Sequence, residues 1–293
     1  MKEPEREGAV DTGHAELGEE GAEQPVVELN PDPGQEAGPG RERQTEDERF
    51  LQREEAEEAE FIHTDPWRVF RIMGEFVEGF DTLAELGPAV SIFGSARIGP
   101  EDPMYGSAEE TGRLFAEDGF AVITGGGPGI MEAANRGAAE AGGRSVGCNI
   151  ELPFEQGMNA WVRTAVNFRY FFVRKTMFVK YAEGFVIFPG GFGTMDELFE
   201  ALTLIQTRKV RNFPIVMFGS GYWGGLLEWL RTVMVGEGKI APADMDLILV
   251  TDSPEEAVDH IIRGHRQQRA DARSRAHRRQ KRRSLGKMFR RDV

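Results

Sequence analysis

The sequence of 293 residues contains a single cysteine, Cys148. One thiol cannot build an internal disulfide framework or a CxxC metal site. No apolar run approaches the roughly 20 residues that a helix needs to cross a bilayer. The N-terminus is acidic, whereas a secretory signal peptide starts with basic residues and an apolar stretch. We therefore expect a cytoplasmic protein without a membrane partner.

Histidine is also scarce, and none of the five lies in the glycine-rich centre of the chain. They are His14, His63, His260, His265 and His277. This placement argues against a histidine-based triad and against a histidine-ligated metal. We expect no metal and no cofactor. The chemistry then has to come from carboxylates, arginine and backbone dipoles.

Charge divides the chain into three parts. Residues 1–60 carry 20 acidic and 6 basic side chains, whereas residues 263–293 carry 13 basic and 2 acidic ones. The acidic part has too little apolar surface to offset the entropy of ordering. We expect a disordered arm over 1–60, in which 46–60 can form a solvated helix. A single domain over 61–262 and a basic tail over 263–293 follow.

The basic tail has two interpretations. A charge run of this kind is most often a solvated segment, helical or disordered, and it can also lie against the acidic arm. The alternative is a patch for nucleic acid or another polyanion. Its one aromatic residue, Phe289, gives no sign of base stacking. Nucleic acid is therefore not expected as a partner, although the tail leaves it open.

The domain alternates short apolar runs with amphipathic segments. Runs typical of strands occupy 89–94, 121–124, 145–150, 185–188, 215–218 and 247–250, with a shorter extended piece at 161–166. Helices are predicted at 65–83, 105–118, 128–141, 169–181, 195–207, 223–235 and from Pro254 onward. Continuously apolar strands between such helices indicate an α/β fold, a doubly wound parallel (Rossmann-like) sheet. The helix at 65–83 has an apolar stripe that packs outside the sheet or on a second subunit.

Three glycine-bearing turns follow predicted strands. They contain Gly94 and Ser95, then Gly125, Gly126 and Gly127, then Gly190, Gly191, Gly193 and Thr194. The carboxyl ends of parallel strands meet at one edge of a sheet, where ligands bind. Glycines let backbone N–H groups approach an anion, and a helix N-terminus favours negative charge. The pattern predicts a phosphate site at this edge.

Two familiar nucleotide motifs are excluded. A dinucleotide fingerprint needs a small residue where Ile130 stands and an acidic residue about 20 positions later. No turn ends in the Gly-Lys-Ser/Thr of a Walker loop. We therefore expect a mononucleotide or sugar phosphate as the ligand, without NAD and without ATP hydrolysis.

Thr194 and Glu197 have two interpretations. Their spacing matches a capping box, in which Thr194 accepts from the backbone and Glu197 reaches back to the cap. Alternatively, Glu197 projects toward a bound sugar and stabilises a developing cation. Glutamine can serve a capping box but cannot stabilise a cation. The variant Glu197→Gln separates the two.

Arg174 stands on the apolar face of the predicted helix at 169–181. A partly buried guanidinium needs acceptors for its five donors, such as a phosphate or a carboxylate. The alternative is that Arg174 binds a backbone carbonyl or a structural glutamate. Lys175 is adjacent and faces another direction.

Together these motifs resemble the Lonely Guy (LOG) family. Residues 189–197, PGGFGTMDE, are similar to its PGGxGTxxE signature, and Arg174-Lys175-x-Met177 is similar to its arginine helix. Residues 125–133 resemble its first nucleotide loop, in the form of a longer-chain branch. The resemblance covers about residues 89–260, and the family usually forms dimers.

The resemblance implies an enzyme that cleaves the N-glycosidic bond of a nucleoside 5′-monophosphate, either AMP or an N6-modified AMP such as isopentenyl-AMP. Arg174 and Glu197 would then be catalytic. The remaining candidates would bind substrate: Gly125, Gly126, Gly127, Gly190, Gly191, Gly193, Thr194, Ser95, Glu132, Lys175 and Thr203. Nothing in the sequence suggests a pyridoxal-phosphate decarboxylase, an older label for such proteins. A broad nucleotide nucleosidase and a non-catalytic nucleotide or cofactor carrier remain as alternatives.

Overall fold

The computed structural model describes residues 45–51, 65–152 and 157–288. The strands in chain order are β1 (Ala89–Phe93), β2 (Ala121–Thr124), β3 (Ser145–Ile150), β4 (Thr164–Phe168), β5 (Phe185–Ile187), β6 (Ile215–Phe218) and β7 (Ile248–Thr251). The helices are α1 (Glu46–Leu51), α2 (Asp65–Leu83), α3 (Pro103–Glu117), α4 (Ile130–Glu140), α5 (Phe171–Tyr181), α6 (Phe192–Gln206), α7 (Ser220–Trp229) and α8 (Pro254–Met288). A π-helical segment, Leu230–Val235, continues α7.

The strands form one sheet in the order β4-β3-β2-β1-β5-β6-β7, and every neighbouring pair is parallel. The chain winds outward from β1 in one direction through β4, and then returns to β5 and winds outward in the other. The predicted doubly wound α/β fold is thus confirmed. The direction reverses between β1 and β5, which is where such sheets bind ligands.

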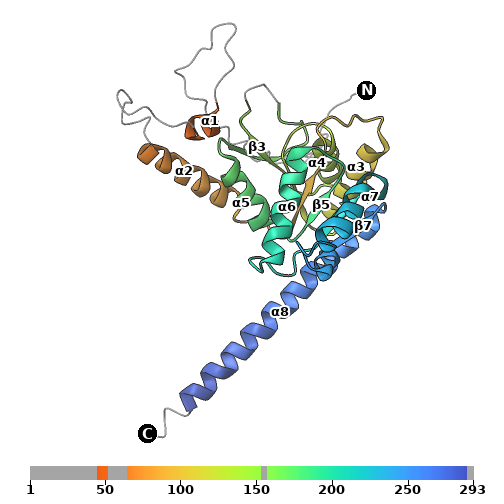
Figure 1. Cartoon of the computed structure of the whole chain (residues 1–293). Coiled ribbons are helices and arrows are strands. Elements are labelled where there is room, and N and C mark those ends of the chain that lie inside the picture. Colours follow the sequence, from red (N-terminus) through yellow and green to blue (C-terminus); the bar gives the residue numbers. More distant parts are fainter. Residues whose placement is uncertain (1–44, 52–64, 153–156, 289–293) are drawn as a thin grey trace, which may run out of the picture.

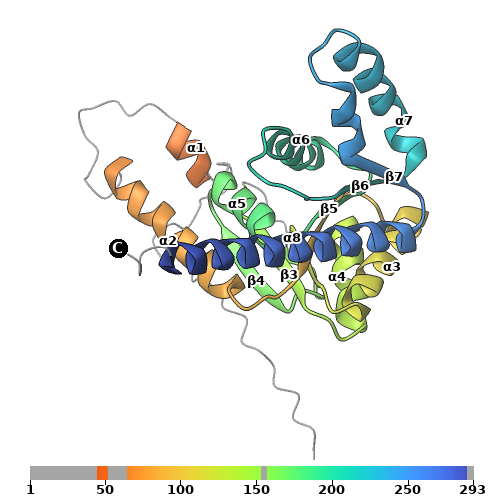
Figure 2. The same cartoon turned by 90° about the horizontal axis from the view of Figure 1, so that it is seen from below.

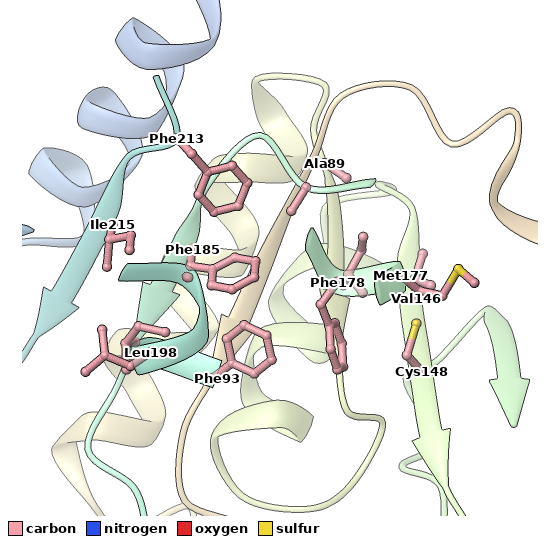
Figure 3. Packing of buried hydrophobic residues seen from close by; sticks show 14 of the residues in the cluster. Ala89, Phe93, Val146, Cys148, Met177, Phe178, Phe185, Leu198, Phe213 and Ile215 are labelled. Atoms are coloured by element: carbon pink, nitrogen blue, oxygen red, sulfur yellow. The ribbon is translucent and has the colours of Figure 1, made fainter. Parts of the chain in front are cut away.

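Side chains of each strand alternate between two cores. One face holds a row of four aromatic rings, Phe178, Phe93, Phe185 and Phe213, whose successive centroids are 4.9 Å apart (Figure 3). The four rings belong to the core cluster on that face. Edge-to-face contacts of this kind add to the burial of apolar area. Helices α2, α5 and α6 cover this face, and α3, α4 and α8 cover the other (Figures 1 and 2).

Helix α2 splits its predicted apolar stripe between two environments. Ile72 and Phe76 pack against the core, and Leu83 is fully buried. Val69 and Met73 remain exposed, at 51% and 55%. The expectation that this helix packs outside the sheet is therefore confirmed, and part of its apolar surface stays uncovered.

Helix α1, from the acidic arm, contacts the N-terminus of α5 through its first residues and exposes its last ones, whereas the sequence predicted a fully solvated helix. The Oε2 atom of the buried Glu46 accepts from the Tyr170 hydroxyl at 3.3 Å, and Asp47 Oδ2 accepts from the Phe171 N–H at 3.0 Å. Glu75 of α2 accepts from the Tyr170 N–H at 3.4 Å. Carboxylates from two other helices thus accept from the N–H groups of Tyr170 and Phe171, where α5 begins. The rest of the acidic arm, 1–44 and 52–60, lies outside the described residues.

Helix α8 begins where the sequence predicts. Pro254 is its first residue, and the Glu256 N–H donates to Ser253 Oγ at 3.2 Å. The helix continues unbroken from the domain into the basic segment and projects from the body (Figures 1 and 2). At 35 residues it is about 50 Å long. In the part of the chain that the structure describes, no helix is long and apolar enough to cross a membrane.

Candidate functional site

A cavity of about 800 Å³ opens at the reversal point between β1 and β5. It is bounded by the turn after β1, the turn after β5 and the helices α5 and α6. Eight of the predicted site residues line it: Ser95, Gly125, Arg174, Gly190, Gly191, Gly193, Thr194 and Glu197. The two candidate catalytic side chains therefore face one compartment, as the phosphate-site hypothesis requires.

The turn after β5 is held by its neighbours. The Ser95 N–H donates to the Pro189 carbonyl at 2.9 Å, which ties the first turn to the third. The Tyr222 hydroxyl, from α7, donates to the Gly190 carbonyl at 2.8 Å. A Cβ on Gly190 would lie 2.1 Å from Thr194 Oγ1, so only glycine permits this close approach. The carbonyls are thus engaged with protein, and the N-terminus of α6 is directed at the cavity.

The capping-box interpretation of Thr194 and Glu197 is wrong. Helix α6 begins at Phe192, and its cap is Gly191, so Thr194 already lies in the third helical position. Glu197 is one turn further in and cannot reach the cap. Glu197 is 5% exposed, and its Oε2 atom has no hydrogen-bond partner among the described residues. Burial raises the pKa of Glu197 to about 7, against the opposing charges of Lys175 and Arg174. A buried carboxyl of this kind is suited to acid–base or electrostatic work.

Arg174 agrees in part with both interpretations, since it binds a backbone carbonyl and also lines the cavity. Its Nε donates to the Cys148 carbonyl at 2.8 Å, and its guanidinium carbon lies 5.1 Å from the centre of the Phe178 ring. The guanidinium also lines the cavity, where Glu197 is its charged neighbour. Burial lowers the pKa of Arg174, yet a guanidinium stays protonated at neutral pH. One edge of the fork is therefore structural, and the other is available to an anionic ligand.

Gly125 is needed for the position of Arg174. A Cβ on residue 125 would lie 2.4 Å from Arg174 Nη2 and 2.8 Å from Met131 Sδ. Both neighbours are ends of flexible side chains, so Gly125→Ala should fold. We expect the variant to displace the guanidinium and, if the cavity cleaves a nucleotide as the motifs imply, to lower kcat/KM about tenfold or more, since misplacement by about 1 Å costs up to 10²-fold. Steady-state kinetics and thermal unfolding check this, with Gly106→Ala, where the Cβ meets nothing within 4 Å, as the control.

Gly126 and Gly127, which the sequence assigns to phosphate binding, lie in a turn that side chains of the protein hold. Asn159 Nδ2 donates to both of their carbonyls, at 3.1 and 3.0 Å, and the Gly126 N–H donates to Thr124 Oγ1 at 3.0 Å. Asn159 thus fixes this turn through its carbonyls. Neither glycine lines the cavity.

Three other predicted binding residues also lie outside the cavity lining. Glu132 faces Tyr105 of α3. Two causes raise the pKa of that tyrosine: burial, which is the larger, and the negative charge of Glu132. The Thr203 hydroxyl donates to the carbonyl of Phe199 in its own helix at 2.7 Å. Lys175 makes ion pairs with Asp196 and Glu200. The spacing along a helix could not show which face each residue takes.

The sequence interpretation missed several lining residues. Arg97 follows Ser95 in the first turn, and the same strand-end argument would have found it. Asn149 is a polar residue in an apolar strand, which was an available signal. Tyr222 and Phe171 also line the cavity, but they lie on helices, and no sequence motif indicates how those helices are oriented. Among the described residues, no group of three or more His, Cys, Asp or Glu is arranged to hold a metal.

The fold and the site together define the class: a Rossmann-like α/β protein with a ligand cavity at the reversal point of its sheet. A family model described as "Possible lysine decarboxylase" matches residues 131–261. The chain is 30% identical over 154 residues to a cytokinin riboside 5′-monophosphate phosphoribohydrolase of Mycobacterium tuberculosis. The aligned region covers 52% of this chain and 81% of that protein. The chain belongs to the Lonely Guy (LOG) family, as its motifs predict.

Two further similarities were found. A cytokinin riboside 5′-monophosphate phosphoribohydrolase of Rhodococcoides fascians is 28% identical over 178 residues, covering 59% of this chain and 88% of that protein. The structure of a molybdenum cofactor carrier protein from Chlamydomonas reinhardtii aligns at a TM-score of 0.44 and 21% identity, covering 60% of this chain and 97% of that chain.

Proposed function

We propose that this protein is a nucleoside 5′-monophosphate phosphoribohydrolase. Water would form a bond to C1′ of the ribose while the C1′–N bond breaks, and the base would leave with the electron pair and take up a proton. The products are free base and ribose 5-phosphate. The observation that carries the proposal is that Glu197 and Arg174 line one cavity with the glycine turn 190–194. The names of the family relatives support the same reaction.

Each part of the cavity has a task in this reaction. The backbone N–H groups of the turn at 190–194, together with the α6 dipole, would hold the 5′-phosphate. Cleavage passes through a cationic, oxocarbenium-like sugar, which the Glu197 carboxylate would stabilise while it orients water. The guanidinium of Arg174 would bind the phosphate or favour departure of the base.

The base would lie against the apolar part of the cavity. Met131, Ile150, Leu152 and Phe171 contribute to this wall. It suits an adenine ring, and a cavity of about 800 Å³ has room for an apolar N6 substituent beside a mononucleotide. We therefore propose AMP and N6-modified AMP, such as isopentenyl-AMP, as the substrates.

The reaction should depend on pH through Glu197. The carboxylate has to be ionised to stabilise a cation, and its pKa is about 7. We expect kcat/KM for AMP to fall about tenfold per pH unit below this value and to level off above it. A pH–rate profile from 5 to 9 measures this. An acid limb with a midpoint near 4.5 would assign the ionisation to an ordinary exposed carboxylate.

A product assay tests the function. The protein is incubated with AMP, isopentenyl-AMP, other nucleoside monophosphates and adenosine, and free base and ribose 5-phosphate are quantified by chromatography. We expect release of base from the monophosphates and little from adenosine, which lacks the anchoring phosphate. Equal turnover across all bases indicates a broad nucleosidase. Binding of nucleotides without any release indicates a carrier.

We also propose that the protein acts as a cytoplasmic homodimer. Exposed apolar side chains of α2 support the dimer, because Phe70, Met73 and Val77 are 55–66% exposed. A contiguous exposed apolar patch is typical of an interaction site. Sedimentation equilibrium of the full chain, beside Phe70→Ser and Val77→Ser, gives the oligomeric state. The expected result is a dimer that these substitutions weaken.

A further inference from the structure

Lys175 makes ion pairs with carboxylates on both sides of Glu197 along α6. Its Nζ lies 2.8 Å from Asp196 Oδ1 and 2.8 Å from Glu200 Oε2. Those two carboxylates stand one residue before and three residues after Glu197 on α6. Lys175 itself follows Arg174 on α5. The ammonium thus joins the two helices that carry the proposed catalytic pair.

Because the Lys175 side chain is largely buried, its contacts with Asp196 and Glu200 differ from a surface ion pair. The Lys175 side chain is 17% exposed, whereas Asp196 and Glu200 are 57% and 34% exposed. Burial lowers the pKa of Lys175, but the carboxylates of Asp196 and Glu200 more than offset this and raise it, so the amine stays protonated. Its donors are directed at α6, and it does not line the cavity. Lys175 is therefore poorly placed to bind a nucleotide.

Glu197 is surrounded by charges of both signs. Lys175 and Arg174 face it from α5, and Glu200 and Asp196 flank it on α6. Arg97, from the first turn, lines the same cavity. Burial raises the pKa of Glu197, Lys175 is the largest opposing influence, and Glu200 adds to the rise. Removing Lys175 also leaves two carboxylates uncompensated beside Glu197.

We propose that Lys175 is a positioning residue that acts through Glu197: it fixes α5 against α6 and holds a positive charge beside the Glu197 carboxylate. This inference rests on the proposed function for its catalytic consequence. It assigns Lys175 a role other than the substrate contact that the sequence suggested. The ion pairs of Lys175 with Asp196 and Glu200 hold its positive charge close to the buried Glu197 carboxylate.

The test uses changes of opposite sign. Lys175→Met should move the acid limb of the kcat/KM profile for AMP upward by about one pH unit, and Glu200→Gln should move it downward by a smaller amount. Lys175→Arg keeps the charge and should restore most of the wild-type profile. Lys180→Met makes the same charge change on α5, where Lys180 lies 5.2 Å from the Phe80 ring centre and away from α6. It should leave the profile unchanged.

A second readout does not depend on turnover. In protein labelled with ¹³C at the glutamate carboxyl, the resonance of Glu197 is assigned by its loss in Glu197→Gln, and its titration midpoint is followed by NMR. The midpoint should rise in Lys175→Met and fall in Glu200→Gln. Shifted midpoints in a protein that releases no base would refute the proposed function and retain the role of Lys175. A raised KM with unmoved midpoints would overturn the inference and return Lys175 to substrate binding.

Discussion

Replacing Glu197 by glutamine should lower the turnover of AMP by about 10²–10³-fold while the protein stays folded. Glutamine has nearly the same shape but cannot offer negative charge to an oxocarbenium-like sugar, and loss of one preorganised electrostatic contact typically costs this much. Because Glu197 takes no part in a cap, the substitution breaks no helix-terminal hydrogen bond. Single-turnover kinetics with AMP measure the chemical step directly.

The same substitution should stabilise the protein at pH 8. The folded-state pKa of Glu197 is about 7, above the usual 4.5, so its contribution to stability is full below pH 4.5 and is lost as the pH rises to 7. Above pH 7 the wild type carries a buried charge that glutamine lacks. We expect the free energy of unfolding of the variant to exceed that of the wild type by about 2–3 kcal/mol at pH 8, and by much less at pH 4.5.

Denaturant unfolding at several pH values measures this difference. Glu132→Gln is the matched control, because residue 132 also lies in the first turns of a helix but outside the cavity lining. It should retain activity within a few fold. Full activity of Glu197→Gln, or a stability difference that does not vary with pH, would remove Glu197 from the site.

Replacing Arg174 by lysine should lower kcat/KM for AMP by about 10²-fold or more, although the charge is kept. One edge of the guanidinium is bound to the Cys148 carbonyl, and the remaining edge faces the cavity. A lysine ammonium has no planar fork and cannot serve both directions at once. The loss should appear for AMP and for isopentenyl-AMP alike, since neither task of Arg174 involves the N6 position.

Arg136→Lys provides the comparison for this prediction. Arg136 is paired with Glu140 on the surface of α4 and lies outside the cavity lining. The control should keep wild-type kinetics. If Arg174→Lys also kept them with an unchanged melting temperature, Arg174 would be assigned to its carbonyl contact alone.

The sheet could be predicted from the sequence because each strand is marked by residues that are neighbours in the chain. The strand runs near 89, 121, 145, 185 and 215 are mostly apolar, and all but the run near 145 lead within two residues to a glycine. The piece at 161–166 proved to be the edge strand β4, three residues later. Shifts of this size arise because apolar runs mark burial and do not mark where hydrogen bonding begins.

The site was only partly predictable, since a sequence does not reveal helix orientation or the contacts between distant segments. The turn at 190–194 and the pair Arg174 and Glu197 carried their own signals. Asn159, which binds the glycines at 126 and 127, comes from a loop 32–33 residues further along. The seat of α1 on α5 joins residues 124 positions apart. No periodicity predicts such contacts.

The central claim is that the phosphate of a nucleotide docks on the turn at 190–194, with the sugar–base bond between residues 174 and 197. A crystal structure of the Glu197→Gln variant with AMP, which should bind without being cleaved, tests this most directly. We predict phosphate oxygens within hydrogen-bond distance of the backbone N–H groups of this turn, and the base against Met131 and Phe171. A phosphate held elsewhere, or a glycosidic bond remote from residue 197, would contradict the account.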